Sequence, residues 1–344
     1  MKKHVKRLII AIVALALGGA FFFGVILANI REDAKKERRN DMSADAAVTE
    51  AEDDSRNILV LGMDRQAGLC DVMMLVNVNF TSNKATVAQI PRDTYAEYTD
   101  GSYKKLNGAY NTLGGADKVA EFLGNAMGIE IDHYVCVGLD TLGAAVDAVG
   151  GVDVKLPCDM FYRDPAQGLY IDLDAGLQHL DGALAEQFVR FRSAYVEGDL
   201  GRIDAQKLFL AAFFEKVAEE LSPALAVKLA SAADSVETDL SISDMLSMGV
   251  RSIGFGAEGI SLVTLPGEEA VATESGAWYY VLSKRANAEI MAEYFGADGD
   301  FDGEGVFLNP DYKSFGDIYR GYSAYELTDI GEVAEKGINI QIKK

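Results

Sequence analysis

Three apolar runs joined by short polar connections constrain the fold of this 344-residue chain more than any other feature. The runs are NILVLGMD (57–64), DVMMLVNVNF (71–80) and ATVAQI (85–90), and their Val, Leu, Ile and Met content indicates buried strands. Connections this short join antiparallel neighbours. We therefore predict a meander in which the first strand ends where the second begins, and the third ends at that same edge.

Charged residues flank these runs at the predicted common edge. Asp64 ends the first run, Asp71 begins the second, and Arg92 and Asp93 follow Pro91 after the third. Two carboxylates at one rim suit Mg²⁺, which proteins typically hold through one or two carboxylates together with phosphate oxygens. The alternative is that Asp64 and Asp71 only terminate strands, and their spacing alone does not decide between the two.

An apolar stripe later in the chain predicts an amphipathic helix from about Ile203 to Leu221, because apolar residues recur there at intervals of three and four. The stripe consists of Leu210, Phe213, Phe214, Val217 and Leu221.

Three arginines gather around the predicted start of this helix. They are Arg190, Arg192 and Arg202, and Gln206 stands one turn after Arg202 on the same helix face. Arginines at a helix N-terminus, which itself carries partial positive charge, indicate a site for an anion such as phosphate. The alternative is a solvated basic face whose arginines pair with carboxylates such as Asp199.

Charge and composition exclude some classes of function. The net charge of −21 argues against a nucleic-acid-binding protein, which needs a basic surface. The cysteines lack CxxC spacing and the histidines show no ligand pattern, so neither a disulfide framework nor a zinc site is indicated. These residues are Cys70, Cys136, Cys158, His4, His133 and His179.

Leu8–Ile30 contains no charged residue over its 23 positions. That length suits a membrane-spanning helix and exceeds the apolar core of a signal peptide. No A-x-A cleavage site follows, so we expect an uncleaved anchor preceded by a short stub, residues 1–7. Residues 31–56 are polar and poor in large apolar side chains, which indicates a tether. Basic residues flank both ends of the anchor and nearly balance, so they do not orient it.

Helices and strands alternate after the meander, which predicts an α/β fold. We expect a three-layer sandwich over residues 57–296, with a central mixed β-sheet flanked by helices. Asp181 has the position of a helix N-cap. Residues 297–344 are rich in aromatic side chains, so this extension packs on the domain or binds a partner. The other expected elements are helices near 117–127, 140–149 and 286–295 and strands at 131–137, 152–156, 260–267 and 277–283.

Several short motifs follow one another in a defined order and spacing from Asn57 to about Gly267. They are NILVLGMDR, CDVMMLVNVN, VAQIPRDTY, KLNGAY, AVGGVDVKLP, IDLDAGLQHLDG, VRFR, GDLGRIDAQKLFL and TLPG. In these motifs the chain resembles the LytR-CpsA-Psr family, the membrane-anchored ligases of cell-wall glycopolymers.

The resemblance implies a phosphotransferase that moves a glycopolymer from a polyprenyl-pyrophosphate carrier onto peptidoglycan, forming a phosphodiester link. It implies a cytoplasmic stub, a single membrane span and an extracytoplasmic catalytic domain. Mg²⁺, with Mn²⁺ as the alternative, is expected on Asp64 and Asp71, and an apolar tunnel is expected for the lipid.

Site residues follow from the same resemblance. The catalytic group is Asp64, Asp71, Arg92 and Asp93, with the general base among these carboxylates. The expected pyrophosphate contacts are Arg65, Arg92, Lys105, Arg190, Arg192, Arg202 and Gln206.

The sequence departs from the family pattern at Leu69, where relatives often carry an arginine two residues before the second aspartate. Either one phosphate contact is missing, or Arg65 supplies it from the same loop. Cys70 beside the site is expected to substitute for a serine rather than act as a nucleophile.

Two other functions compete with the transferase. The first is a polyprenyl-pyrophosphate phosphatase that uses water as the acceptor at the same site. The second is a non-catalytic regulator of the envelope or of transcription, against which the stub of about seven residues counts because it cannot hold a DNA-binding module.

Overall fold

The computed structural model describes residues 54–64, 68–98, 103–165, 168–219, 225, 228, 236–241, 244, 247–248, 251, 259–271, 275–298, 325 and 327–343. The expected membrane anchor, nearly all of the tether, Arg65 and most of the aromatic-rich extension lie outside these residues. Within the described part, no helix is long and apolar enough to cross a membrane.

A seven-stranded mixed sheet forms the centre of the fold, in the order β11-β6-β1-β2-β3-β12-β15. The predicted meander is confirmed, because β1 pairs antiparallel with β2 and β2 antiparallel with β3. β6 and β12 then add parallel to β1 and β3. The strands are β1 (Ser55–Asp64), β2 (Leu69–Asn79), β3 (Lys84–Gln89), β6 (His133–Gly138), β11 (Glu237–Thr238), β12 (Ile260–Thr264) and β15 (Thr328–Asp329).

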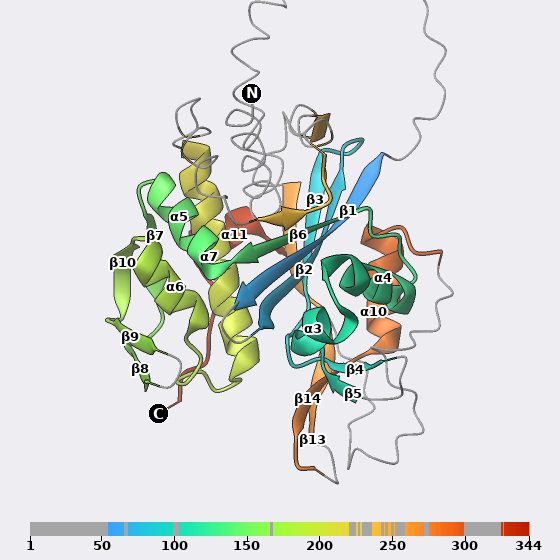
Figure 1. Cartoon of the computed structure of the whole chain (residues 1–344). Helices are drawn as coiled ribbons and strands as arrows, with labels where there is room; N and C mark the ends of the chain where they lie inside the picture. Colours follow the sequence, from blue (N-terminus) through green and yellow to red (C-terminus); the bar gives the residue numbers. More distant parts are fainter. Residues whose placement is uncertain are drawn as a thin grey trace, which may run out of the picture.

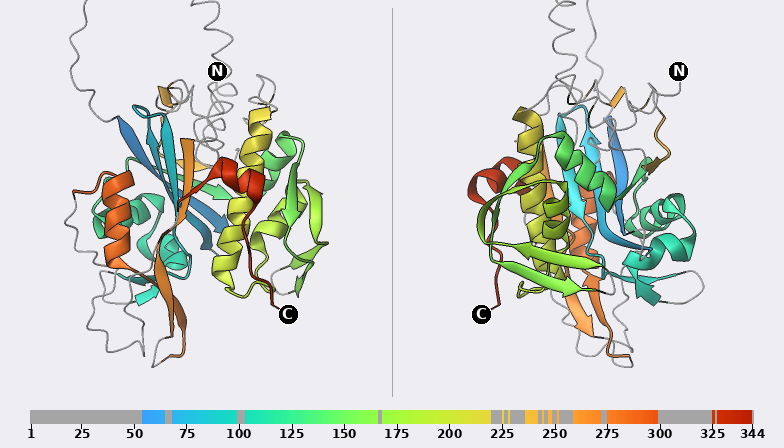
Figure 2. Two further views of the ribbon diagram at one scale, coloured as in Figure 1. Left: turned by 180° about the vertical axis from the view of Figure 1, so that it is seen from behind. Right: turned by 60° about the vertical axis from the view of Figure 1, so that its left-hand side comes forward.

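Two helical layers cover the sheet, so the predicted three-layer sandwich is confirmed (Figures 1 and 2). Strand residues alternate between the layers: Ile58 and Val60 join one apolar core, and Leu59 and Leu61 join the other. The first layer contains α5 (Leu139–Ala148), α6 (Gly182–Arg190), α7 (Asp199–Glu219) and α11 (Ile330–Lys336). The second contains α3 (Ala109–Leu113), α4 (Ala116–Met127) and α10 (Lys284–Tyr294).

Four antiparallel pairs project from this framework. Three strands lie between residues 157 and 180, where the sequence predicted none. They were missed because they are half-exposed and contain no continuous apolar run. The pairs are β4 (Tyr95–Glu97) with β5 (Tyr103–Lys105), β7 (Val152–Leu156) with β10 (Gly176–Leu180), β8 (Met160–Asp164) with β9 (Leu169–Leu173), and β13 (Gly267–Val271) with β14 (Trp278–Leu282). A short 3-10 turn, Leu106–Gly108, follows β5.

The predicted start of the long helix near Ile203 is wrong, because α7 begins at Asp199. Its first turn is polar and therefore carries no apolar periodicity to reveal it. Gly198 precedes the helix with a φ of 54°, a value that glycine adopts readily. The N-cap prediction is confirmed, since the Asp181 carboxylate accepts a 2.9 Å hydrogen bond from the Leu184 amide at the start of α6.

The described end of the chain packs on the domain. β15 adds an edge strand to the central sheet beside β12, and the apolar side chains Ile330 and Val333 of α11 enter the same core as α7. An isolated β-bridge joins Tyr195 to Ile342. The end of the chain therefore closes over the layer that carries α7.

Helices α5 and α6 touch backbone to backbone where two glycines meet. A Cβ added to Gly182 would lie 2.3 Å from the carbonyl oxygen of Gly143, whereas a Cβ added to Gly143 would find its first neighbour at 3.4 Å. We expect Gly182→Ala to lower the free energy of unfolding by about 1–3 kcal/mol, because the two helices must move apart. Urea denaturation measures this change.

Gly143→Ala is the matched control, because it probes the same contact from the other helix. It is expected to be neutral or stabilising by up to about 1 kcal/mol, since alanine favours helix. Equal losses in both variants would contradict the close approach at Gly182.

Candidate active site

Asp71 occupies an irregular position on β2. Gly62 on β1 pairs with Val72 and Met63 pairs with Cys70, so Asp71 is the extra residue of a β-bulge. Bulges redirect a side chain and often lie beside active sites. Gly62 permits the close approach, because a Cβ there would lie 2.9 Å from the Cβ of Val72.

Arg92 reaches this carboxylate from the turn after β3. Its Nη1 lies 2.5 Å from Asp71 Oδ1, which confirms that the second strand and the Pro-Arg-Asp turn meet at one rim. Burial alone would lower the pKa of Arg92, but the carboxylates of Asp199, Asp71 and Asp93 outweigh burial and raise that pKa. The guanidinium therefore remains charged in a largely enclosed position.

Arg202 is the most deeply buried charge of the site, with only 4% of its side chain exposed. Its Nη2 donates a 3.1 Å hydrogen bond to the backbone carbonyl of Asp71 and lies 2.9 Å from Asp199 Oδ1. Burial lowers the pKa of Arg202; Asp199 opposes this shift and nearby Arg92 adds to it. Arginine still remains protonated, because its ordinary pKa lies above about 12.

Arg190 and Arg192 approach from the end of α6 and the residues after it. Arg190 Nη2 lies 3.4 Å from Asp64 Oδ2, and its Nη1 donates a 2.9 Å bond to Glu186. Arg192 is 51% exposed, and its nearest carboxylate contact is Asp199 at 4.0 Å. The arginines thus range from fully enclosed to half-exposed.

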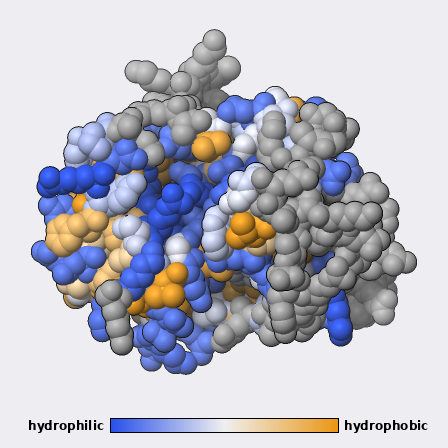
Figure 3. Space-filling view, turned by 90° about the horizontal axis from the view of Figure 1, so that it is seen from below, coloured by the Kyte–Doolittle hydropathy of each residue, from blue (hydrophilic) through white to orange (hydrophobic). Residues whose placement is uncertain are grey.

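These four arginines line one polar cavity of about 220 Å³, together with Asp71 and Tyr162. Figure 3 shows the end of the molecule toward which β1 points, where strongly hydrophilic side chains gather between apolar patches. Two buried donors on this site, Arg92 Nε and Arg202 Nε, have no hydrogen-bond partner among the described residues. Enclosed cations with unused donors favour an anion.

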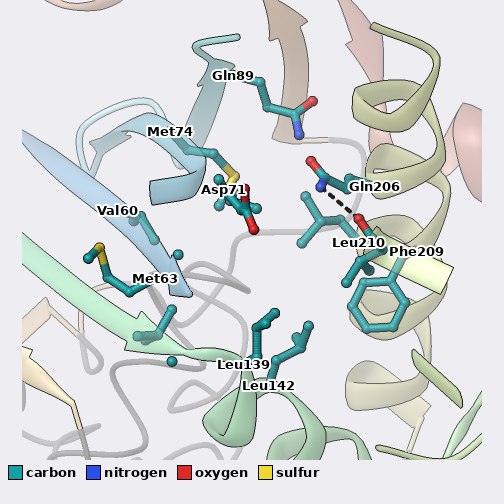
Figure 4. A pocket seen from close by; sticks show the side chains of 15 residues that line it. Val60, Met63, Asp71, Met74, Gln89, Leu139, Leu142, Gln206, Phe209 and Leu210 are labelled. Atoms are coloured by element: carbon teal, nitrogen blue, oxygen red, sulfur yellow. Dashed lines mark hydrogen bonds between the residues drawn. The ribbon is translucent and has the colours of Figure 1, made fainter. Parts of the chain in front are cut away.

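A second cavity, of about 70 Å³ and almost entirely apolar, meets the first at Asp71. Figure 4 shows Asp71 between Met63 and Met74 on one side and Phe209 and Leu210 of α7 on the other. Leu139 and Leu142 of α5 close the cavity. An anion site and an apolar cavity therefore share one carboxylate.

Three other predicted site residues lie beside this arrangement. Gln206 lines the apolar cavity, and its amide donates a 3.0 Å bond to the carbonyl of Val189. Lys105 Nζ lies 3.1 Å from Asp93, so these two charges pair with each other. The structure places none of the three on the wall of the arginine cavity.

Cys70 does not have the environment of a nucleophile. It is fully buried, and its thiol lies 3.0 Å from the sulfur of Met63. Burial, with smaller effects from Cys136 and Asp71, raises the pKa of Cys70 to about 12. Because the thiolate is the reactive form, this cysteine is inert near neutral pH.

Asp199 is the site residue that sequence reasoning missed, since it was considered only as a partner for a solvated basic face. It begins α7, and its Oδ1 contacts three arginines of the cavity. The signal available in the sequence was an acidic residue directly after Gly198, at the position where a helix N-terminus favours negative charge.

No group of three or more His, Cys, Asp or Glu side chains in the described part of the chain is placed to hold a metal. Mg²⁺ does not need such a group, because it is commonly held by one or two carboxylates and substrate phosphates. Asp71 contacts Arg92 and Arg202 through Oδ1. Asp64 pairs with Arg190, which lines the same cavity as Asp71, so both carboxylates have the oxygen chemistry that Mg²⁺ prefers.

Comparison with known proteins gives consistent matches. Residues 23–295 match the LytR_cpsA_psr family. The chain is 28% identical over 294 residues to the polyisoprenyl-teichoic acid–peptidoglycan teichoic acid transferase TagV of Bacillus subtilis, covering 81% of this chain and 75% of TagV. It is also 28% identical to the transferase TagU of Oceanobacillus iheyensis over 315 residues, covering 84% of this chain and 96% of TagU.

The fold is similar to solved structures as well. The crystal structure of Bacillus subtilis TagV superposes with a TM-score of 0.57 at 26% sequence identity, covering 71% of this chain and 98% of the TagV chain. The central mixed sheet and its helical layers are therefore shared with a protein that bears the transferase name.

Proposed function

Because this chain belongs to the LytR_cpsA_psr family, we propose that it transfers a teichoic-acid-type glycopolymer from a polyisoprenyl pyrophosphate carrier onto peptidoglycan. One observation carries the proposal at the level of the site: the arginine cavity and the apolar cavity meet at Asp71. A lipid pyrophosphate has the same two parts, an anionic group joined to an apolar chain.

The arginine cavity would bind the pyrophosphate. Arg92 and Arg202 are enclosed and hold fixed positions against Asp71, so they suit the group that reacts. Fixed donors aimed at developing charge lower the barrier, because the site needs little rearrangement during the reaction. Arg192 is half-exposed and would contact the outer phosphate or the first sugar.

The apolar cavity would receive the beginning of the lipid. Its lining comes from β1, β2, α5 and α7, including Val60, Leu142 and Phe209. A volume of about 70 Å³ is smaller than a polyprenyl chain, so the walls formed by α5 and α7 must separate for the chain to enter. Gln206 would close the polar end of this cavity rather than grip the phosphates.

Asp64 and Asp71 would hold Mg²⁺, with Mn²⁺ as the alternative. When bound, such an ion supplies Lewis-acid stabilisation of the phosphate oxygens. One of the carboxylates Asp64, Asp71 and Asp93 would act as general base for the acceptor hydroxyl, and Asp93 is held ready beside the cavity rather than on its wall. It lies beside Arg92 at the rim, and Lys105 holds it through the 3.1 Å contact.

Product analysis separates this transferase from a phosphatase. Purified protein with a synthetic polyprenyl-pyrophosphate glycan and peptidoglycan should release lipid phosphate and attach the glycan covalently to peptidoglycan. Release of lipid phosphate with free phosphorylated glycan, unchanged by peptidoglycan, would favour the phosphatase. No release under either condition would favour a non-catalytic regulator.

The proposed substrates require an extracytoplasmic catalytic domain. We expect protease added to intact spheroplasts to digest residues 57–344, because the lipid-linked glycan and peptidoglycan lie outside the membrane. An antibody against the domain measures its loss, with a cytoplasmic protein as the control for intact cells. A protected domain would contradict both the location and the substrate.

A further inference from the structure

Four charged side chains form a closed ring at the arginine cavity, and three of them, Asp71, Arg92 and Arg202, line its wall. Arg92 contacts Asp71 through Nη1 at 2.5 Å and Asp199 through Nε at 3.3 Å. Arg202 contacts Asp199 through Nη2 at 2.9 Å and Asp71 through Nη1 at 4.0 Å. Positive and negative groups therefore alternate around the ring, and each carboxylate lies between the two arginines.

Asp199 attracts these arginines without consuming their hydrogen-bonding capacity. All of its arginine contacts use Oδ1, yet neither Asp199 oxygen makes a hydrogen bond with another described residue. Arg92 Nε and Arg202 Nε are likewise without hydrogen-bond partners in the described part. The ring therefore holds the guanidinium groups by charge, and Arg202 Nε remains as a donor for a ligand.

We propose that Asp199 is a positioning residue that keeps Arg92 and Arg202 apart and correctly aimed for the reacting phosphate. This inference rests on the proposed function of the same site. Two buried guanidinium groups repel each other, and the carboxylate between them removes that repulsion. Arg192, which reaches the same Oδ1 at 4.0 Å, is drawn toward the cavity by the same charge.

A purely local role does not account for these contacts. An acidic residue at the start of α7 stabilises the helix dipole wherever its side chain points. Asp199 instead faces Arg92 and Arg202, and only 14% of its side chain is exposed. Asp204, on the same helix, pairs instead with Lys207, at 3.0 Å.

Asp199→Asn tests the proposal, because it removes the charge and keeps the size of the side chain. We expect kcat to fall at least tenfold in the transfer assay, since the arginines lose their alignment. Inorganic pyrophosphate should bind at least as tightly as to the wild type, because the cavity has lost one negative charge. Calorimetric titration with pyrophosphate and the melting temperature are measured on the same samples.

Asp204→Asn is the matched control and should leave both kcat and pyrophosphate binding unchanged. A kcat within twofold of the wild type for Asp199→Asn would overturn the proposal. Loss of kcat, binding and melting temperature together would also overturn it, because that pattern describes a structural residue.

Asp199→Glu covers the case in which the asparagine variant fails to fold. It retains the charge but moves it by one methylene, so we expect wild-type pyrophosphate binding with a reduced kcat. A glutamate variant with wild-type kcat would contradict a requirement for position.

Pyrophosphate binding also separates this inference from the proposed function. A wild-type protein that binds pyrophosphate but transfers no glycan would overturn the proposed function, while tighter binding by Asp199→Asn would still support charge control by Asp199. Weaker binding by a folded asparagine variant would overturn the inference whatever the activity of the wild type.

Discussion

Asp71→Asn is expected to reduce glycan transfer by roughly 10²–10³-fold, the size of effect seen when one preorganised electrostatic contact is removed from an active site. Asp71 joins the arginine cavity to the apolar cavity, and its Oδ1 lies 2.5 Å from Arg92. Asparagine keeps the shape but can no longer neutralise the arginine or hold Mg²⁺ in the proposed arrangement. The measurement is kcat/KM with the polyprenyl-pyrophosphate glycan at several Mg²⁺ concentrations.

Asparagine is preferable to alanine at this position, because Asp71 also has a structural role. Its charge offsets Arg92 and Arg202, which are both largely enclosed. We expect a loss of about 1–3 kcal/mol in the free energy of unfolding for Asp71→Asn, as for other hydrogen bonds to charged groups. Asp153→Asn is the control, since Asp153 pairs with His179 on an exposed strand pair. Full activity in folded Asp71→Asn would remove this residue from the site.

Arg202→Lys is expected to lower kcat/KM roughly 10–150-fold, although it conserves the charge. This loss corresponds to about 1.5–3 kcal/mol of transition-state stabilisation. The guanidinium of Arg202 reaches the Asp71 carbonyl and the Asp199 carboxylate from one planar group. A lysine ammonium is a single point and cannot reproduce that geometry. The loss should appear mainly in kcat, because Arg202 is proposed to contact the reacting phosphate.

Arg192→Lys is the matched comparison within the same cavity. Arg192 is half-exposed and makes only a 4.0 Å contact with Asp199, so its ion pair contributes about 0–1 kcal/mol. We expect this variant to lose less than Arg202→Lys and to change KM more than kcat. Equal kcat/KM values for Arg202→Lys and the wild type would contradict the proposal that Arg202 contacts the reacting phosphate.

The pattern of apolar runs and short connections predicted the central strands of the fold, because the length of a connection alone limits how two successive strands can pair. Short connections between apolar runs permit only antiparallel neighbours, so β1, β2 and β3 and their shared rim followed from the sequence. The same reasoning brought Asp71 and Arg92 together before any distance was known. The half-exposed strands β8, β9 and β10 carry no such apolar signal and were missed.

The sequence by itself predicted the charged residues that line the arginine cavity, since arginines gathered at strand and helix ends stand out in a chain of net charge −21, but it did not predict Asp199. Only the tertiary structure decided how they pair. A bulge turns Asp71 toward two cavities, and α7, beginning four residues before its predicted start, places Asp199 against three arginines. The packing of α7 also places Gln206 on the wall of the apolar cavity. Pairing depends on distances between segments far apart in the chain, and such distances are set by packing rather than by local sequence.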